Sequence, residues 1–362
     1  MASGSALVVR FSSLGDVLLA AHVPTYLRRA VPGRRVLFLT KERHAAALRG
    51  HPDVDRFYML EDGSGDPAKP APLGIRGGLG DLIAFLRREN VDEVIDLHQS
   101  LRSSRVVSAF DRARRTIAPK HALRRRVMVF AKWLHPEPVP PLLRTYRLLA
   151  GVDPDRADPS PWLCAALTDA EVARARAAVG PDAGRFVLFG AGARWETKRW
   201  PARHFAALSR AVEREFGLAS RFALAPEETA IAEELRALLP GAPPDAIVAR
   251  DFRETAAIAS FARAIVSNDS AVLHLGPALD VPALALFGST VPAFGFAPQG
   301  ALDRVAEIAL GCRPCDVHGK RRCPLKHHDC MERLSPEIAL DALRGMLAAS
   351  SARGPVGAGT SA

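Results

Sequence analysis

Short apolar runs alternate along the chain with longer segments in which apolar residues recur every three or four positions. In the first half, this pattern predicts strands and helices at 6–11 (strand), 17–29 (helix), 36–40 (strand), 81–88 (helix) and 94–97 (strand). Parallel strands that are buried on both faces read as continuous apolar runs, so the pattern favours a parallel sheet covered by helices. The Gly- and Pro-rich segment 61–80 predicts an exposed loop.

A second series of strands and helices follows a Pro-rich stretch near residue 140. It predicts strands at 186–189, 221–225, 264–267 and 283–287, with helices at 142–149, 202–215, 227–238, 254–262 and 336–349. Two such series indicate an α/β protein with two doubly wound domains. We place these domains at 1–160 and 161–349, and we expect the small-residue tail 350–362 to be disordered.

Composition and charge narrow the class of protein. The 362 residues contain no apolar run near the ~20 residues that cross a bilayer, and the N-terminus lacks a secretory signal, so we expect a cytoplasmic protein. The net charge is +10, and the first 165 residues hold 26 basic and 17 acidic residues. Only 6% of residues are aromatic and we find no nucleic-acid-binding motif. The basic half therefore favours an acidic glycan or an anionic membrane surface over nucleic acid.

The first predicted strand runs directly into Ser12-Ser13-Leu14-Gly15-Asp16. Ligands of open α/β sheets bind at the carboxyl ends of the strands, which places Asp16 where it can meet a substrate. A carboxylate can accept a proton from an attacking hydroxyl. The alternative is that Asp16 only caps the helix that follows.

The segment Ser267-Asn268-Asp269-Ser270-Ala271-Val272-Leu273-His274 also joins a strand to a helix. Free N–H groups at a helix start predict a seat for a diphosphate. His274 lies on nearly the same helix face as Ser270, although an isolated His on such a face is more often structural. Pro277 predicts that the helix is broken near Gly276.

Two further strand ends carry candidate chemistry. After Gly190-Ala191-Gly192, the chain leads to Lys198, which could neutralise a departing phosphate or could belong to a solvated basic loop. Phe287-Gly288-Ser289-Thr290 is a loop suited to phosphate oxygens or a sugar.

Four cysteines lie close together near the C-terminus in a C-x2-C-x7-C-x6-C pattern. Such clustering in a cytoplasmic protein raises the possibility of structural zinc above that of disulfides. The second pair lacks the C-x2-C spacing of the usual zinc ribbons, so we do not favour zinc and predict no metal cofactor. The cysteines are Cys312, Cys315, Cys323 and Cys330, within the Cys-rich segment 312–330.

Together these motifs resemble the bacterial ADP-heptose lipopolysaccharide heptosyltransferases, which form glycosyltransferase family 9. The resemblance rests on seven motifs in family order: VVRFSSLGDVLLA (8–20), FLTKERHA (38–45), VIDLHQSLRSS (94–104), KRWP (198–201), NDSAVLHL (268–275), ALFGST (285–290) and CPLKHHDC (323–330). It implies a GT-B fold, in which two Rossmann-like domains face a central cleft and bind acceptor on the N-terminal and donor on the C-terminal domain. It also implies inverting transfer of heptose from ADP-heptose to a lipopolysaccharide inner-core (Kdo/heptose) acceptor, without a catalytic metal.

The resemblance also implies roles for individual residues. Asp16 is similar to the general base, and Lys198 to the donor-phosphate contact. Lys41 and Arg102, each near a predicted strand end, are candidates for acceptor binding. The expected donor-binding residues are Ser13, Gly15, Glu228, Asn268, Asp269, Ser270, Ala271, His274 and Thr290.

Some residues depart from the family pattern. Asp269-Ser270-Ala271 stands where Asp-Thr-Gly is common, Ser289 where proline is usual, and Gly276-Pro277 where a plain helical pair is usual. Ala tolerates positive φ less well than Gly. Since these changes lie in the segments expected to bind the donor, they bear on the identity of the donor. One alternative is a related enzyme that uses another nucleotide sugar in surface polysaccharide synthesis. The other is a non-catalytic nucleotide-binding or zinc-stabilised scaffold.

The basic stretch 105–126 contains eight Lys or Arg residues and one Asp. It could contact a phosphorylated, Kdo-rich glycolipid or the cytoplasmic face of the inner membrane, to which the protein would bind peripherally. Alternatively, it is a solvated basic helix and loop.

Overall fold

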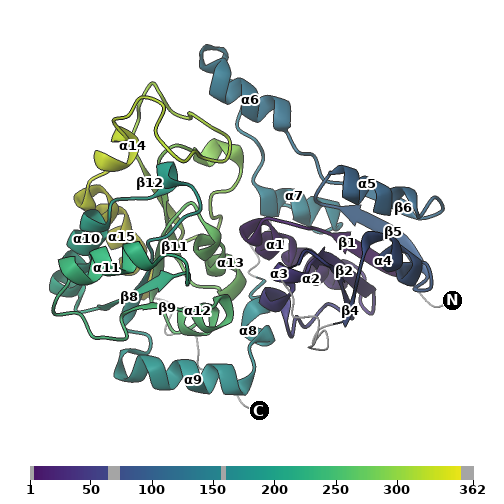
Figure 1. The fold of residues 1–362 in the computed structure, drawn as a ribbon, viewed down its shortest axis with the longest axis horizontal. Coiled ribbons are helices and arrows are strands. Elements are labelled where there is room, and N and C mark those ends of the chain that lie inside the picture. The colour runs from purple at the N-terminus through teal and green to yellow at the C-terminus, as the bar shows by residue number, and fades with distance from the viewer. Residues whose placement is uncertain (1–3, 64–73, 156–159, 352–362) are drawn as a thin grey trace. The chain divides into compact units, whose positions relative to one another are not determined.

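Each half of the chain folds around a six-stranded parallel sheet (Figure 1). The computed structural model describes residues 4–63, 74–155 and 160–351. Contacts divide the chain into two units: unit 1 combines residues up to Lys120 with Leu142–Leu167, and unit 2 combines His121–Pro141 with the residues from Thr168 onward. The segment His121–Pro141, which lies within the expected domain 1–160, thus packs with unit 2.

The sheet of unit 1 has the strand order β4-β3-β2-β1-β5-β6. Strand order reverses between β1 and β5, because β2 to β4 follow on one side of β1 and β5 and β6 on the other. The elements of unit 1 are β1 (Ser5–Val9), α1 (Leu14–Ala20), α2 (His22–Ala30), β2 (Arg35–Lys41), α3 (Glu42–Ala45), β3 (Arg56–Leu60), β4 (Gly74–Gly77), α4 (Leu79–Leu86), β5 (Val91–Asp96), α5 (Leu101–Ser108), β6 (Arg114–Ile117), α7 (Leu142–Leu149) and α8 (Trp162–Ala166).

The sheet of unit 2 has the order β12-β11-β10-β7-β8-β9 and reverses in the same way between β7 and β10. The elements of unit 2 are α6 (Ala122–Phe130), the 3-10 turn η2 (Lys132–Leu134), α9 (Asp169–Val179), β7 (Phe186–Gly190), α10 (Ala202–Phe216), β8 (Ala219–Leu224), α11 (Thr229–Leu238), β9 (Ile247–Ala249), α12 (Phe252–Ala259), β10 (Ala264–Asn268), the 3-10 turn η5 (Ala271–His274), α13 (Leu275–Leu279), β11 (Ala283–Phe287), β12 (Arg304–Glu307), α14 (Asp329–Glu332) and α15 (Pro336–Ser351).

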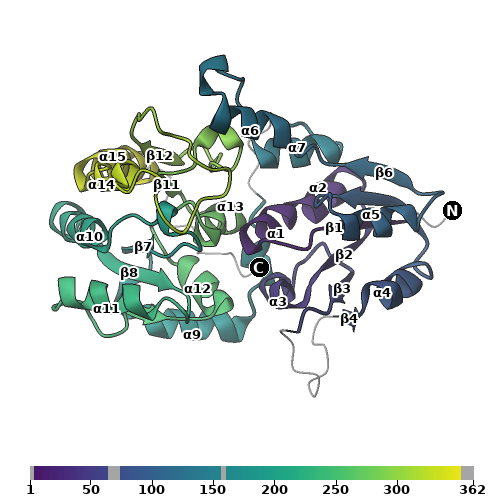
Figure 2. The same ribbon diagram turned by 45° about the horizontal axis from the view of Figure 1, so that its top comes forward.

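Helices cover both faces of each sheet, as right-handed crossovers between parallel strands require (Figure 2). In unit 2, α10, α11 and α15 supply apolar side chains to one core with β7, β10 and β11, while α12 and α13 lie over the opposite face (Figures 1 and 2). The central strands β1, β7, β10 and β11 are buried throughout. This confirms the predicted α/β class with two doubly wound parallel sheets.

Several predicted boundaries were wrong. The helix expected at 17–29 is two helices, α1 and α2, which meet at Ala21. The loop expected at 61–80 contains strand β4 and the start of α4; its residues 64–73, like the tail residues 352–362, lie outside the described part of the chain. None of the helices in the described residues is long and apolar enough to span a membrane.

Candidate active site

In unit 1, the site residues gather where strand order reverses, at the carboxyl ends of β1 and β5. Strand β1 ends at Val9, and the turn that follows delivers Asp16 in the first turn of α1. Helix α1 begins there because Ser13 is its N-cap residue and Asp16, three positions later, completes a capping box. Such a reversal point is the usual ligand-binding place of an open α/β sheet.

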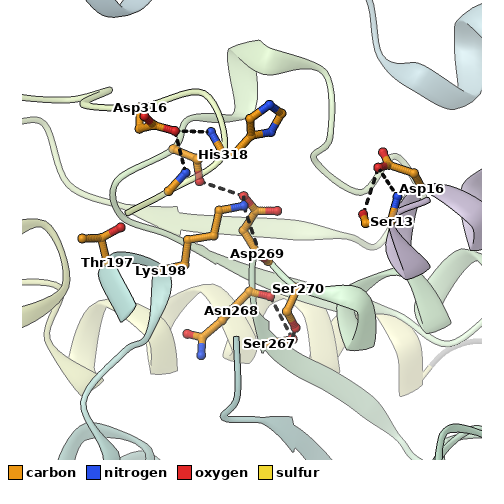
Figure 3. Close-up of polar contacts among 12 residues, drawn as sticks. Ser13, Asp16, Thr197, Lys198, Ser267, Asn268, Asp269, Ser270, Asp316 and His318 are labelled. Carbon is orange, nitrogen blue, oxygen red and sulfur yellow. Dashed lines mark hydrogen bonds and ion pairs between the residues drawn. The ribbon is translucent and has the colours of Figure 1, made fainter. Parts of the chain in front are cut away.

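Asp16 is held through only one of its two carboxylate oxygens. Its Oδ2 accepts hydrogen bonds from the backbone N–H of Ser13 at 3.0 Å and from the Ser13 hydroxyl at 2.9 Å (Figure 3). The same oxygen lies 2.7 Å from the guanidinium of Arg10. Among the described residues, none donates a hydrogen bond to Oδ1. Asp16 therefore caps its helix, as the alternative interpretation proposed, and still presents a second oxygen for other chemistry.

The surroundings of Asp16 keep it ionised. Burial favours the neutral acid, but the Arg10 guanidinium and the Ser13 hydrogen bonds outweigh burial and hold the pKa of Asp16 below its usual value. From the end of β5, burial lowers the pKa of His98 to about 4, aided by Arg10 and Lys120, so this imidazole is neutral at pH 7. Sequence reasoning assigned no role to Arg10 or His98, although both stand at predicted strand ends.

The two predicted acceptor cations occupy neighbouring strand ends. Lys41 is the last residue of β2, which pairs with β1, and Arg102 lies in the first turn of α5, just after β5. Neither side chain forms an ion pair with another residue that the structure describes. Both are therefore available to an anionic ligand.

In unit 2, strand order reverses between β7 and β10, and Asn268 ties their ends together. Its side chain is fully buried. The Asn268 amide nitrogen donates to the carbonyl of Ala191 at 2.8 Å, and its oxygen accepts from the backbone N–H of Trp200 at 3.0 Å. With both ends of its amide used in this way, Asn268 positions the two loops around the expected donor seat.

Lys198 and Asp269 form a mostly buried ion pair beside these loops. The ammonium group of Lys198 lies 2.6 Å from Oδ2 of Asp269, and Figure 3 shows the lysine side chain extending to that carboxylate. The hydroxyl of Thr290 donates to the same oxygen at 2.7 Å. Burial alone would raise the pKa of Asp269, but Lys198 and Thr290 outweigh it and lower the pKa. Three predicted site residues, which lie on three different loops, thus meet at one carboxylate.

The turn after β10 differs from the helix that was predicted there. It is a four-residue 3-10 turn, η5, followed by the five-residue helix α13. Gly276 and Pro277 lie inside α13, so the expected break near Gly276 was wrong; the change of helix type comes earlier, at His274. Because α13 has only five residues, its macrodipole is small, and the backbone N–H groups of the turn would contribute more to anion binding than the dipole does.

Two predicted residues of this turn are placed without strain. Ala271 is absent from the residues with positive φ, so alanine meets no backbone penalty where the family commonly has glycine. The hydroxyl of Ser270 lies 3.3 Å from that of Ser267. His274 is buried and adds to the lowering of the pKa of Asp269.

Glu228 lies just before α11 and reaches back toward the loop after β7. Its Oε2 accepts a hydrogen bond from the backbone N–H of Ala225 at 2.9 Å. A Cβ atom on Gly192 would lie about 2.0 Å from the same oxygen, so only glycine permits this approach. Burial raises the pKa of Glu228. The contact links Glu228 to the loop that carries Lys198.

The Cys-rich segment 312–330 forms hydrogen bonds to two of the site loops, residues 287–290 and the loop that contains Thr197 and Lys198. Arg313 donates to the carbonyl oxygens of Phe287 at 3.2 Å and Thr290 at 3.0 Å, and also to that of Gly288. The backbone N–H of Lys320 donates to the hydroxyl of Thr197 at 2.8 Å. Sequence reasoning missed Arg313, whose role depends on a fold that brings residues 287–290 beside it.

The four cysteines of the segment are free thiols. Burial raises the pKa of Cys330 to about 11. In the part of the chain that the structure describes, no group of three or more His, Cys, Asp or Glu side chains is arranged to hold a metal ion. Through the contacts described above, the segment supports the loops that carry Lys198 and Thr290.

Two doubly wound units, each with polar residues at the reversal of its strand order, have the architecture of the GT-B fold. The model of Glycosyltransferase family 9 (heptosyltransferase) matches residues 80–327, and the chain belongs to this family. This confirms the resemblance on which the sequence interpretation rested.

Individual relatives agree with the family assignment. The chain is 28% identical to lipopolysaccharide heptosyltransferase 1 of Pseudomonas aeruginosa, covering 95% of this chain and 98% of that protein. A family 9 glycosyltransferase from Veillonella parvula has a similar fold, with a TM-score of 0.70 at 18% identity over 96% of this chain and 98% of the other. The E. coli heptosyltransferase WaaC with ADP also has a similar fold, with a TM-score of 0.63 at 19% identity over 94% of this chain and 99% of the other.

Proposed function

We propose that the protein transfers heptose from ADP-heptose to a Kdo/heptose inner-core acceptor of lipopolysaccharide, with inversion and without a catalytic metal. Membership of a heptosyltransferase family supports the reaction class. The name of the Pseudomonas aeruginosa relative supports the acceptor, and the ADP held by the E. coli neighbour supports the nucleotide. A glycolipid acceptor would place the enzyme at the cytoplasmic face of the inner membrane.

On the donor side, we assign the departing diphosphate to Lys198 and the backbone N–H groups of Ser270 and Ala271. Thr290 donates its one hydroxyl proton to Asp269 and so helps to hold that carboxylate. As the bond from the anomeric carbon to the phosphate oxygen breaks, its electron pair remains on that oxygen. A preorganised cation stabilises the developing charge. Asp269 is itself anionic and engaged, so we assign it to positioning Lys198 and Thr290. Asn268 and Glu228 position the surrounding loops.

On the acceptor side, Asp16 is the general base. Its open Oδ1 takes the proton of the attacking hydroxyl, and the hydroxyl oxygen forms the new bond to the anomeric carbon opposite the departing phosphate. A carboxylate held in place through Oδ2 and kept ionised by Arg10 is prepared for this step. This one-oxygen anchoring of Asp16 is the observation that carries the proposal.

The remaining predicted residues receive supporting roles. Lys41 and Arg102 bind carboxylates or phosphates of the acceptor. Ser13 orients Asp16, and Gly15 lets the α1 turn approach a ligand closely. Because Lys198 supplies positive charge at the phosphates, the proposed reaction proceeds without a divalent metal.

A donor panel tests the proposal. The protein is incubated with a Kdo-lipid acceptor and either ADP-heptose or UDP-sugars, with and without EDTA. We expect ADP release and a heptosylated acceptor from ADP-heptose alone, unaffected by EDTA and with the opposite anomeric configuration by NMR. Transfer only from a UDP-sugar would replace the donor assignment. Absence of transfer together with salt-sensitive nucleic-acid binding would support a non-catalytic scaffold.

A further inference from the structure

Helix α6 and turn η2 carry a group of apolar side chains, four of them exposed and Val127 half-buried, which we call the α6 stripe: Leu123, Val127, Phe130, Trp133 and Leu134. Four of these are largely exposed, with 77% of Leu123, 76% of Phe130, 72% of Trp133 and 62% of Leu134 open to solvent. Leu123, Val127 and Phe130 are spaced i, i+4, i+7, so they share one face of α6. Figure 2 shows α6 at the edge of unit 2.

The opposite face of α6 already fixes the helix to unit 2. Met128 and Val129 are buried in a small apolar core with Val139 and Phe294. The guanidinium of Arg125 lies 4.6 Å from the ring centre of Phe296. Because these contacts hold the helix in place, the α6 stripe has no packing role within this unit that would explain its apolar side chains.

Positive charge flanks the stripe on both sides. At 100° per residue, Arg124 and Arg126 project on opposite sides of the row, and both are exposed. This arrangement of an apolar row with aromatic residues between cations is typical of helices that lie in the headgroup region of anionic bilayers. Each cation near such a surface adds about 1 kcal/mol of attraction. The nine residues of α6 are far too few to span the bilayer.

We propose that the α6 stripe inserts into the headgroup boundary of an anionic membrane and docks unit 2 there. The charge of the flanking arginines selects an anionic lipid surface over a neutral one and over an apolar protein partner. The inference deepens the proposed function by naming the surface through which the enzyme meets the bilayer, but it does not depend on which sugar is transferred.

Vesicle binding of the full-length protein tests the proposal without donor or acceptor. Vesicles of phosphatidylglycerol and phosphatidylcholine are compared with phosphatidylcholine alone. We expect binding to the anionic vesicles, with at least about a tenfold weaker partition coefficient for the Leu123→Ser/Phe130→Ser variant. Arg124→Glu/Arg126→Glu should weaken it by about tenfold or more. Leu325→Ser, at a leucine of unit 2 that is 60% exposed and lies outside the stripe, is the control and should bind like the wild type.

Trp133 provides a direct probe of insertion. It is the most exposed of the four tryptophans, since Trp162 and Trp200 are buried and Trp195 is half-buried. On anionic vesicles its emission should shift to the blue and be quenched by brominated lipids, and Trp133→Phe should remove most of both changes. Undiminished signals in Trp133→Phe would overturn the proposal.

Two other outcomes would also overturn it. One is equal binding of the wild type and the Leu123→Ser/Phe130→Ser variant to anionic vesicles. The other is a change of oligomeric state in that variant by analytical ultracentrifugation, with no vesicle binding by the wild type, which would make the stripe a contact between copies. Transfer to a water-soluble Kdo acceptor should be unchanged in the variant. Loss of docking and failure of the proposed function can therefore be told apart.

Discussion

At the point where its strand order reverses, each sheet carries one ion pair between a carboxylate and a cation. The two pairs differ in which partner is more exposed. In unit 1, the carboxylate of Asp16 is the more exposed partner at 21%, against 14% for Arg10. In unit 2, the ammonium of Lys198 is the more exposed partner at 15%, and Asp269 behind it is 9% exposed. The same fold thus presents an anion at one site and a cation at the other.

This difference matches the two halves of a displacement reaction. The attacking hydroxyl must lose a proton, which a carboxylate can accept, and the departing diphosphate gains negative charge, which a cation can stabilise. In each pair, the more buried partner holds the presented group in position and in its charged form. Substitutions that remove one partner of either ion pair therefore test whether Asp16 serves the attacking hydroxyl and Lys198 the departing diphosphate.

The largest effect is expected for Asp16→Asn. The substitution keeps the size of the side chain but removes the proton acceptor, so turnover should fall by about 10²–10⁴-fold. Initial rates of ADP release measure it. Ser13→Ala is the control, because it removes a capping hydrogen bond worth about 1 kcal/mol and leaves the carboxylate in place. Equal losses in both variants would mean that Asp16 serves the helix alone.

Lys198→Met should come next. Loss of the cation is expected to lower turnover by about 10²–10³-fold. It also leaves Asp269 buried without its cation, which should lower the free energy of unfolding by about 3 kcal/mol. Rates and urea denaturation measure the two effects separately. The Lys198→Met/Asp269→Asn double variant should recover stability but not turnover, and recovery of both would remove Lys198 from the chemistry.

Asn268→Ala tests whether that residue positions loops. It leaves the N–H of Trp200 and the carbonyl of Ala191 without their partner, so the free energy of unfolding should fall by about 1–3 kcal/mol. Urea denaturation measures this loss. A variant of unchanged stability that binds ADP weakly would instead make Asn268 a direct ligand contact.

Lys41→Ala and Arg102→Ala should have smaller and selective effects. Single exposed ion pairs contribute up to about 1 kcal/mol, so each variant should raise the acceptor KM by about fivefold or less. The donor KM should not change. Steady-state kinetics with varied acceptor check this, and a rise in donor KM alone would move these residues from the acceptor to the donor.

The smallest expected change concerns pH. The pKa of Asp16 is lowered in the folded protein, so its carboxylate stays ionised as the pH falls from 8 to about 5. The turnover rate should therefore show no acid limb from this residue in that range. The stability that the lowered pKa values of Asp16 and Asp269 contribute is present above about pH 4 and is lost as the pH falls further. An acid limb near pH 6 that Asp16→Asn abolishes would contradict this environment.

The sequence predicted the central strands well and the outer strands poorly. Strands β1, β7, β10 and β11 are buried on both faces and read as apolar runs. The edge strands β4, β6 and β12 contain charged residues and were missed, because one side of an edge strand faces solvent. The join between α1 and α2 was missed because Ala21 keeps helical φ and ψ, although Pro24 in the first turn of α2 is a signal for the start of a new helix.

The candidate residues were found from motifs, but their contacts were not. Lys198 and Asp269 are 71 positions apart, and nothing local to either indicates that they pair. The open Oδ1 of Asp16 depends on Arg10 and Ser13 both binding Oδ2, which is a matter of three-dimensional geometry. Likewise, only the fold shows that α6 packs with unit 2 and leaves a second apolar face exposed.

Calorimetric titration of ADP into Asp16→Asn and Lys198→Met tests these roles of Asp16 and Lys198 most directly. We predict that Asp16→Asn binds ADP with a Kd close to that of the wild type although it has lost turnover, and that Lys198→Met binds ADP at least about tenfold more weakly. Weakened ADP binding in Asp16→Asn together with unchanged binding in Lys198→Met would contradict the account.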